Sequence, residues 1–169
     1  MPATSQKPLN LESLSTDQFD IASLNDEIRV DLLCVEMIRT FFATMAQQTN
    51  LEPADVGRVC HGIDYFLREF VIAECRDNLL QLDASHVRRF AGHWYIVKNL
   101  EPNMAELTLI LDGIAAFYQF LESVNLVAAE QLDKIRASCA ERDFYQQRIE
   151  DFWAIEGDGF LAWRDAIPL

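Results

Sequence analysis

Two pairs of potential metal ligands stand at helical spacing in this sequence. His61 and Asp64 are three residues apart, as are Asp83 and His86, so each pair shares one face of a helix. Carboxylate-bridged di-metal bundles take Glu-x-x-His pairs from two helices and further carboxylates from two others. Here the pairs contain Asp, one pair is reversed, and the expected inner faces of the other helices lack matching acids. A small helical metalloprotein is therefore our second alternative, and we predict no metal and no cofactor.

The sequence also lacks the arrangements that nucleophilic or phosphate chemistry needs. Cys60 precedes His61, but neighbours on a helix point in different directions, so this thiol does not face the imidazole. The turn at 157–159 has the sequence Gly-Asp-Gly and follows no strand, which argues against a phosphate-binding loop. No Ser-centred nucleophile elbow is present. We therefore predict no catalytic residue and a protein that is not an enzyme.

The chain is strongly acidic, but one predicted helix carries a short basic strip. The 169 residues include 14 basic and 27 acidic side chains, a net charge of −13, which argues against strong binding to nucleic acid. Arg88, Arg89 and Lys98 are the best local candidates for contact with a phosphate backbone. The simpler interpretation is a solvated helix face whose arginines pair with neighbouring acids.

Hydrophobic residues make up 50% of the chain, enough for the core of one ordinary domain. The four cysteines lie far apart in apolar helical patterns, so we predict free buried thiols. No signal peptide is visible at the N-terminus, and no apolar run approaches the length needed to cross a bilayer. These features predict a cytoplasmic protein that does not enter a membrane.

The chain divides into a peripheral N-terminal arm, residues 1–22, and a single helical domain, residues 23–169. Ser23 and Asp26 form an acidic capping box at the start of the first helix. The 3.6-residue period predicts one inward stripe on this helix. Its members are Ile28, Leu32, Val35, Ile38, Phe42 and Met45.

Start and stop signals divide the remaining chain into further helices. Pro53 opens the second helix, in which Gly57 and Gly62 permit a close helix crossing and which can break near Cys75. Asp83 caps the third helix. Pro102 opens a fourth, which is the most hydrophobic and therefore the central one. Asn125 is a suitable left-handed stop for it.

Two aromatic residues lie in the C-terminal tail. Phe160 and Trp163 follow the last predicted helix, so they are the candidate contacts for a partner. A tail folded back over the core is the alternative outcome for both.

Residues from Ile63 to Val127 resemble the N-terminal SAM-like core-binding domain of tyrosine recombinases and phage integrases. Phe66-Leu67 precedes a capped helix, Asp83 to Phe90, similar to the "DV..F" element of that family. The run from Ile114 to Val127 has the spacing of the family's "ALR.FFRFL...G.I" run, with Ala115-Ala116 in place of the usual basic residue. The resemblance implies a four-helix SAM-like core. The family's catalytic domain is absent here, so recombination is not implied.

These observations lead to one reading and two alternatives. We predict an all-α bundle of five to six helices, with a SAM-like, integrase-N-terminal-like core and extra terminal helices. Its predicted role is a non-enzymatic interaction module that binds a protein partner or itself. The first alternative is an accessory DNA-binding domain related to recombinases. The second is the metalloprotein with His61, Asp64, Asp83 and His86.

Overall fold

The computed structural model describes residues 9–48 and 50–167. Every regular element within these two ranges is helical, which confirms the predicted all-α class. The main elements are α1 (Leu24–Gln48), α2 (Pro53–Asp64), η3 (Tyr65–Cys75), α3 (Ala84–Arg89), η4 (Phe90–Trp94), α4 (Tyr95–Lys98), α5 (Met104–Ser123), α6 (Ala129–Cys139), α7 (Arg142–Trp153) and α8 (Phe160–Asp165). Two short 3₁₀ turns, η1 (Leu11–Ser13) and η2 (Thr16–Phe19), precede them.

Several of these elements join end to end. The segment η3 is a wide, π-helical continuation of α2. The π-helical η4 likewise joins α3 to α4 in one rod. The described residues therefore form seven rods, where five to six main helices were predicted, and α8 in the tail is the additional one.

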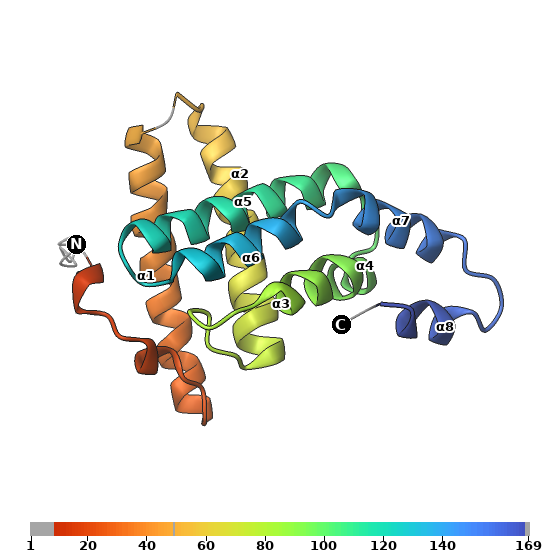
Figure 1. The fold of residues 1–169 in the computed structure, drawn as a ribbon, viewed down its shortest axis with the longest axis horizontal. Coiled ribbons are helices and arrows are strands. Elements are labelled where there is room, and N and C mark those ends of the chain that lie inside the picture. Colours follow the sequence, from red (N-terminus) through yellow and green to blue (C-terminus); the bar gives the residue numbers. More distant parts are fainter. Residues whose placement is uncertain (1–8, 49, 168–169) are drawn as a thin grey trace, which may run out of the picture.

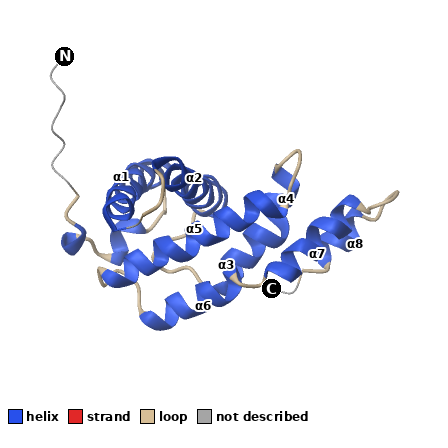
Figure 2. Cartoon of the chain, turned by 90° about the horizontal axis from the view of Figure 1, so that it is seen from above, coloured by secondary structure: helices blue, strands red, loops and turns tan. Residues whose placement is uncertain are grey.

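The rods pack in two directions. The helix α1 lies beside the α2–η3 rod, and α5 crosses this pair with α6 alongside it (Figures 1 and 2). The rod α3–η4–α4 packs on α6 and α7. In Figure 1, α1 lies at one side of the molecule and the α7–α8 pair projects at the other. The first long helix, α1, and the last two helices, α7 and α8, thus lie far apart in space.

The crossing of α2 and α5 depends on glycine. A Cβ atom at Gly62 would lie 3.1 Å from the Cα of Ile110, and one at Gly113 would lie 3.1 Å from the carbonyl oxygen of Val59. Both distances are shorter than ordinary side-chain packing allows. The predicted close crossing is confirmed at Gly62. It is wrong for Gly57, where an added Cβ would meet nothing within 4 Å.

The predicted helix boundaries are largely confirmed. Asp26 Oδ2 accepts from the backbone nitrogen of Ser23 at 2.9 Å, and Asp83 Oδ1 accepts from that of Ser85 at 2.8 Å. Asn125 is left-handed, with φ 61°. The helix α5 begins two residues after Pro102, because Asn103 accepts the backbone N–H of Glu106 and caps it.

The inward face predicted for α1 is wrong for most of its residues. Ile28, Leu32 and Phe42 are exposed, Val35 and Met45 are half-buried, and of the six predicted residues Ile38 alone is buried. The buried set consists of Val30, Cys34, Met37, Ile38 and Phe41. The helix carries apolar residues on two faces, and each set repeats with a helical period. Periodicity alone therefore could not decide which face α2 and η3 would cover.

The helix α5 corrects the expectation about apolar runs. Met104–Ser123 has an 18-residue window of mean hydropathy 1.3, so by length and composition it could cross a membrane. Half of that window, 50%, is buried inside the structure. Central helices of water-soluble folds meet the same criterion, so this property carries no assignment.

The described part of the predicted arm, residues 9–22, is held against the domain. Phe19 is fully buried against the helices. The side-chain nitrogen of Asn78 donates to the Thr16 carbonyl at 2.8 Å and to Asp20 Oδ1 at 2.7 Å. The rest of the arm, residues 1–8, lies outside the described residues. Phe19 therefore ties residues 9–22 to the body.

Candidate functional site

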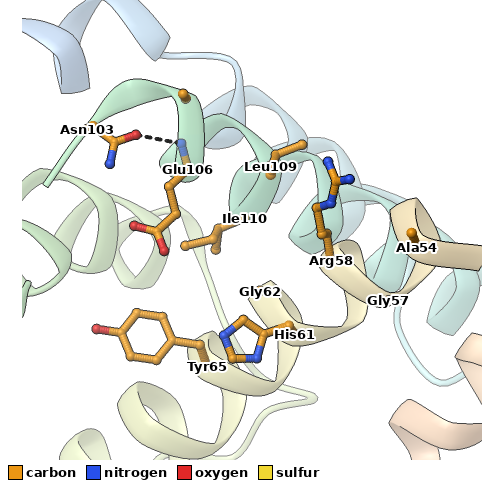
Figure 3. Close-up of a pocket in the computed structure, with 11 residues that line it drawn as sticks. Ala54, Gly57, Arg58, His61, Gly62, Tyr65, Asn103, Glu106, Leu109 and Ile110 are labelled. Carbon is orange, nitrogen blue, oxygen red and sulfur yellow. Dashed lines mark hydrogen bonds between the residues drawn. The ribbon is translucent and has the colours of Figure 1, made fainter.

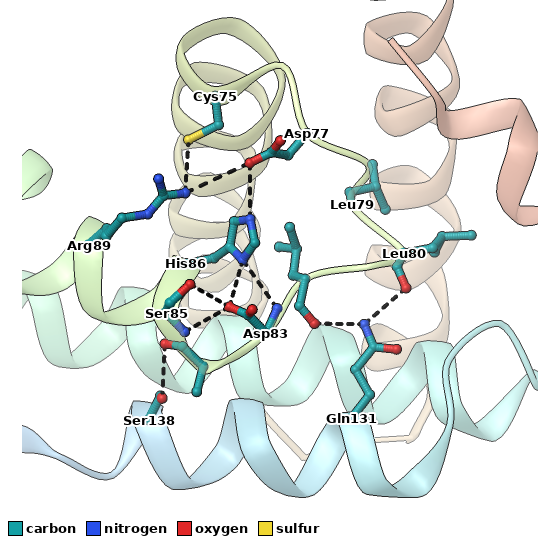
Figure 4. A network of polar contacts seen from close by, with 12 residues as sticks. Cys75, Asp77, Leu79, Leu80, Asp83, Ser85, His86, Arg89, Gln131 and Ser138 are labelled. Carbon is teal, nitrogen blue, oxygen red and sulfur yellow. Dashed lines mark hydrogen bonds and ion pairs between the residues drawn. The ribbon is translucent and has the colours of Figure 1, made fainter. Parts of the chain in front are cut away.

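The four candidate metal ligands fall in two separate places. His61 lies on the α2 side of a surface cavity, and Asp64 binds Arg68 at 3.1 Å. Asp83 and His86 lie at the start of α3 (Figure 4). Within residues 9–48 and 50–167, no three His, Cys, Asp or Glu side chains form a group able to hold a metal ion. Within each pair the two residues are near neighbours along one helix, but the fold does not bring the two pairs together.

The polar network around His86 contains the residue types of a catalytic triad in the wrong order. The ring nitrogens of His86 lie 3.0 Å from Asp83 Oδ1 and 3.0 Å from Asp77 Oδ2 (Figure 4). The hydroxyl of Ser85 donates to Asp83 at 2.6 Å and not to the imidazole. A serine nucleophile needs histidine as its proton acceptor. Hydrogen bonds from Ser85 and then His86 lower the pKa of Asp83 to about 2, which suits a permanently charged helix cap.

The thiols lack the features of reactive cysteines. Cys34, Cys60 and Cys139 are free and buried, as predicted, and burial raises the pKa of Cys139 to about 12. Cys75 is half-buried, 3.7 Å from Arg89 Nη2. Burial nevertheless raises its pKa more than Arg89 lowers it. Nucleophilic cysteines have a lowered pKa, so none of these four fits that chemistry.

The three predicted nucleic-acid contacts do not point to a common surface. Arg88 Nε donates to Glu141 at 2.8 Å, and Arg89 Nη2 lies 3.7 Å from Asp77. These acids belong to different parts of the fold, so the two arginines diverge. Lys98 Nζ lies 6.0 Å from the centre of the Trp94 ring. A role of these residues in DNA contact stays a prediction.

The two tail aromatics have different surroundings. Trp163 is only 6% exposed, and its ring stacks on His93 at a centroid distance of 5.4 Å. Phe160 is 38% exposed. Of the predicted pair, only Phe160 is thus on the surface. The most exposed aromatic side chain nearby is Trp153, at 58%, which the sequence reasoning did not single out.

A cavity of about 710 Å³ lies between α2 and α5 (Figure 3). Its polar groups include His61, Tyr65 and Glu106, and its apolar wall includes Leu109 and Ile110.

Two of these polar residues, Glu106 and Tyr65, form hydrogen bonds with side chains outside the cavity lining. Glu106 Oε2 accepts from the Tyr95 hydroxyl at 2.7 Å, and the Tyr65 hydroxyl accepts from Asn99 at 3.1 Å. Burial raises the pKa of Tyr65, so its hydroxyl stays neutral at physiological pH. These groups stabilise the junction of α4 and α5 and show no arrangement for acid–base catalysis.

A further candidate site is the outer face of α1. We use this name for the row formed by Leu24, Ile28, Leu32 and Phe42, which are 66%, 53%, 63% and 39% exposed. Val35, half-buried, continues the same side of the helix. A hollow of about 530 Å³ flanks Ile28 and Leu32 on the side of the N-terminal arm. Single exposed apolar residues are ordinary, whereas these four lie along one face of one helix.

Sequence reasoning missed this surface because it assigned Ile28, Leu32 and Phe42 to the core. The available signal was an excess of apolar positions on the helix, more than one buried stripe can use. The chain matches no protein-family model, no curated protein and no solved structure.

Proposed function

We propose that this protein is a non-enzymatic interaction module that binds a protein partner, or a second copy of itself, through the outer face of α1. The observation that carries the proposal is the aligned exposure of Leu24, Ile28, Leu32 and Phe42. Covering such a row removes apolar area from water. This burial stabilises a complex by roughly 25 cal/mol for each Å² buried. An amphipathic helix from a partner is the simplest cover for it. A cytoplasmic location belongs to the same proposal.

A photo-crosslinking residue at position 32 tests the proposal directly. The modified protein is expressed in cells that make this chain naturally, irradiated, and analysed by mass spectrometry. Position 32 should yield a discrete adduct, with either another protein or the same chain. Leu100 provides the matched control, because it is a leucine of 96% exposure outside the row. If the yield from position 32 is no higher than from position 100, the outer face of α1 is not an interaction surface.

The alternative from the family resemblance is an accessory DNA-binding domain with a SAM-like core at residues 63–127. The Asp83-capped helix and the long helix that stops at Asn125 support the predicted core. A gel-shift assay at low salt tests the activity. Retardation of duplex DNA that is lost in Lys98→Glu supports the alternative, and an unretarded duplex contradicts it.

A further inference from the structure

We infer that the occupant of the outer face of α1 is the same face of a second copy, with the two helices antiparallel. This inference rests on the proposed function and identifies its partner. Isologous contact in a two-fold dimer requires a surface that is complementary to itself. Apolarity, charge and the order of charges along the helix each bear on that requirement.

Each acid of α1 is paired with an arginine. The helix contains four carboxylates, and the structure pairs each with a different guanidinium, although Arg68 also binds Asp64 of α2. These pairs are Asp26–Arg29, Glu27–Arg76, Asp31–Arg68 and Glu36–Arg39, with distances of 3.3, 3.4, 2.7 and 2.5 Å. The surplus of acid that gives the chain its net charge of −13 therefore lies elsewhere.

This neutrality favours a second copy over a charged partner. Two copies of a protein with net charge −13 repel each other over most of their surfaces. The outer face of α1 is a region where like surfaces can meet with little repulsion. A strongly basic partner would find its complement on the other, acidic surfaces, because charge complementarity guides partner choice. A neutral, apolar helix is the matching cover, and this chain carries one.

The order of charges selects the antiparallel direction. Arg29 and Glu36 are seven residues apart, on the same side of the helix, with Leu32 between them. In an antiparallel pair centred near Leu32, Arg29 of one copy lies opposite Glu36 of the other. A parallel pair would instead place like charges together. Arg29 is also fixed in position, because it donates to the Gln18 carbonyl and to the Asp20 carbonyl.

The size of the surface sets the expected strength. The 25 residues of α1 extend over about 37 Å. A single pair of such helices buries less than the roughly 800 Å² per partner of a standard interface. The dimer should therefore be weak, with a dissociation constant on the order of micromolar.

Sedimentation velocity over about 5 μM to 1 mM tests the inference. The unmodified chain should shift from its monomer mass of 19.4 kDa towards twice that value as concentration rises. Leu32→Glu should stay monomeric over the same range, because it places an unpaired carboxylate at the centre of the contact. Leu100→Glu, at an exposed leucine outside the row, should dimerise like the unmodified chain. A monomer at every concentration, or dimerisation unaffected by Leu32→Glu, overturns the inference.

Cysteine crosslinking tests the direction of the helices and does not depend on Leu32→Glu folding. In a Cys75→Ser background, which removes the partly exposed native thiol, Leu32→Cys should form an intermolecular disulfide under mild oxidation. Leu24→Cys should not, because in the antiparallel pair its two copies lie about 24 Å apart. Equal crosslinking at both positions indicates parallel helices and overturns this geometry.

Failure of the inference is distinguishable from failure of the proposed function. A monomeric protein whose position 32 crosslinks to a different protein in cells excludes the second copy and retains the interaction module. A chain with no adduct at position 32 and no self-association excludes both.

Discussion

Two regions at opposite sides of the molecule present large apolar side chains outside the central crossing, and only one of them is covered (Figure 1). On the outer face of α1, Leu24 and Leu32 are largely exposed. At the other side, Trp163 of α8 is almost completely enclosed. Both regions were recognisable in the sequence as apolar, so hydrophobicity does not account for the difference.

The burial of Trp163 depends on one buried side chain, that of Arg148. Arg148 Nη1 donates to the Trp163 carbonyl at 2.6 Å, and Arg148 Nε donates to the Gly92 carbonyl at 2.9 Å. The indole N–H of Trp163 donates back to the Arg148 carbonyl at 3.0 Å. The guanidinium carbon also lies 4.0 Å from the centre of the indole ring. Arg148 of α7 thus joins η4 and α8 to its own helix, because its side chain satisfies one backbone carbonyl of each.

The corresponding arginine on the outer side of α1 is Arg29, which holds the N-terminal arm through the carbonyls of Gln18 and Asp20. The other arginines at α1 pair with its acids, and these are Arg39, Arg68 of η3 and Arg76, which directly follows η3. Arg148 fixes α8 against α7 and η4, and this contact encloses Trp163. Arg29 fixes the arm beside α1, but Leu24, Ile28 and Leu32 remain exposed.

Removing the covered indole should give the largest loss of stability. Trp163→Ala deletes a buried ring and leaves Arg148 with fewer partners, so the free energy of unfolding should fall by about 3 kcal/mol. Urea denaturation followed by circular dichroism measures this change. Trp153→Ala is the matched control, because Trp153 is 58% exposed and its loss should cost less than about 1 kcal/mol. Equal losses for the two variants would show that Trp163 is not enclosed against α7 and η4 in solution.

Two glycines of α2 extend the contrast between covered and open positions. Gly62→Ala places a methyl group 3.1 Å from the Ile110 backbone and should lower the free energy of unfolding by about 1–3 kcal/mol. Gly57→Ala meets open space and should raise it by up to about 1 kcal/mol, the ordinary gain in helix propensity. Thermal unfolding of both variants gives the two signs. A loss of stability in Gly57→Ala contradicts the assigned crossing.

Local signals predicted the limits of helices well. The side chains of Asp26 and Asp83 cap helices where the sequence indicated, and Asn125 adopts the left-handed stop. These features depend on residues within one turn of each other, so the sequence contains all the information they need. The π-helical segments were not predictable in the same way, because a widened turn leaves no local residue signature.

The candidate site depends on tertiary packing, so most of it could not be predicted from the sequence. Ile28 and Val30 lie two positions apart on α1, and only the placement of α2 and η3 decides which one is buried. Trp163 in the tail is buried because Arg148, fifteen residues away, reaches its carbonyl. An apolar period identifies a helix, whereas the identity of its free face requires knowledge of its neighbours.

The covered region should also be sensitive to acid through His93. Burial, then the nearby cations Arg148 and Arg164, lower the pKa of His93 below its ordinary 6.5. The unfolded chain therefore binds a proton more readily than the folded chain as pH falls below about 6.5. Stability contributed by neutral His93 is fully present above that pH and is lost as pH falls towards the lowered value.

Replacing His93 isolates this contribution. Urea denaturation at about pH 7.5 and pH 5.5 spans the unfolded value while staying above the ordinary range of carboxylates. The unmodified chain should lose more stability between these two conditions than His93→Gln does. The same loss in both proteins would mean that His93 does not titrate against the folded state.

The smallest effect on the stability of the monomer is expected for a substitution on the outer face of α1. The difference in melting temperature between this variant and the unmodified chain should grow with protein concentration. Leu32→Gln alters an exposed side chain, so at about 1 μM its free energy of unfolding should lie within about 0.5 kcal/mol of the unmodified value. Association stabilises the folded state by mass action, so the melting temperature of the unmodified chain should rise between about 1 μM and 500 μM. That of Leu32→Gln should stay constant. If both melting temperatures rise equally, self-association uses another surface, and the outer face of α1 differs from the Trp163 region in exposure alone.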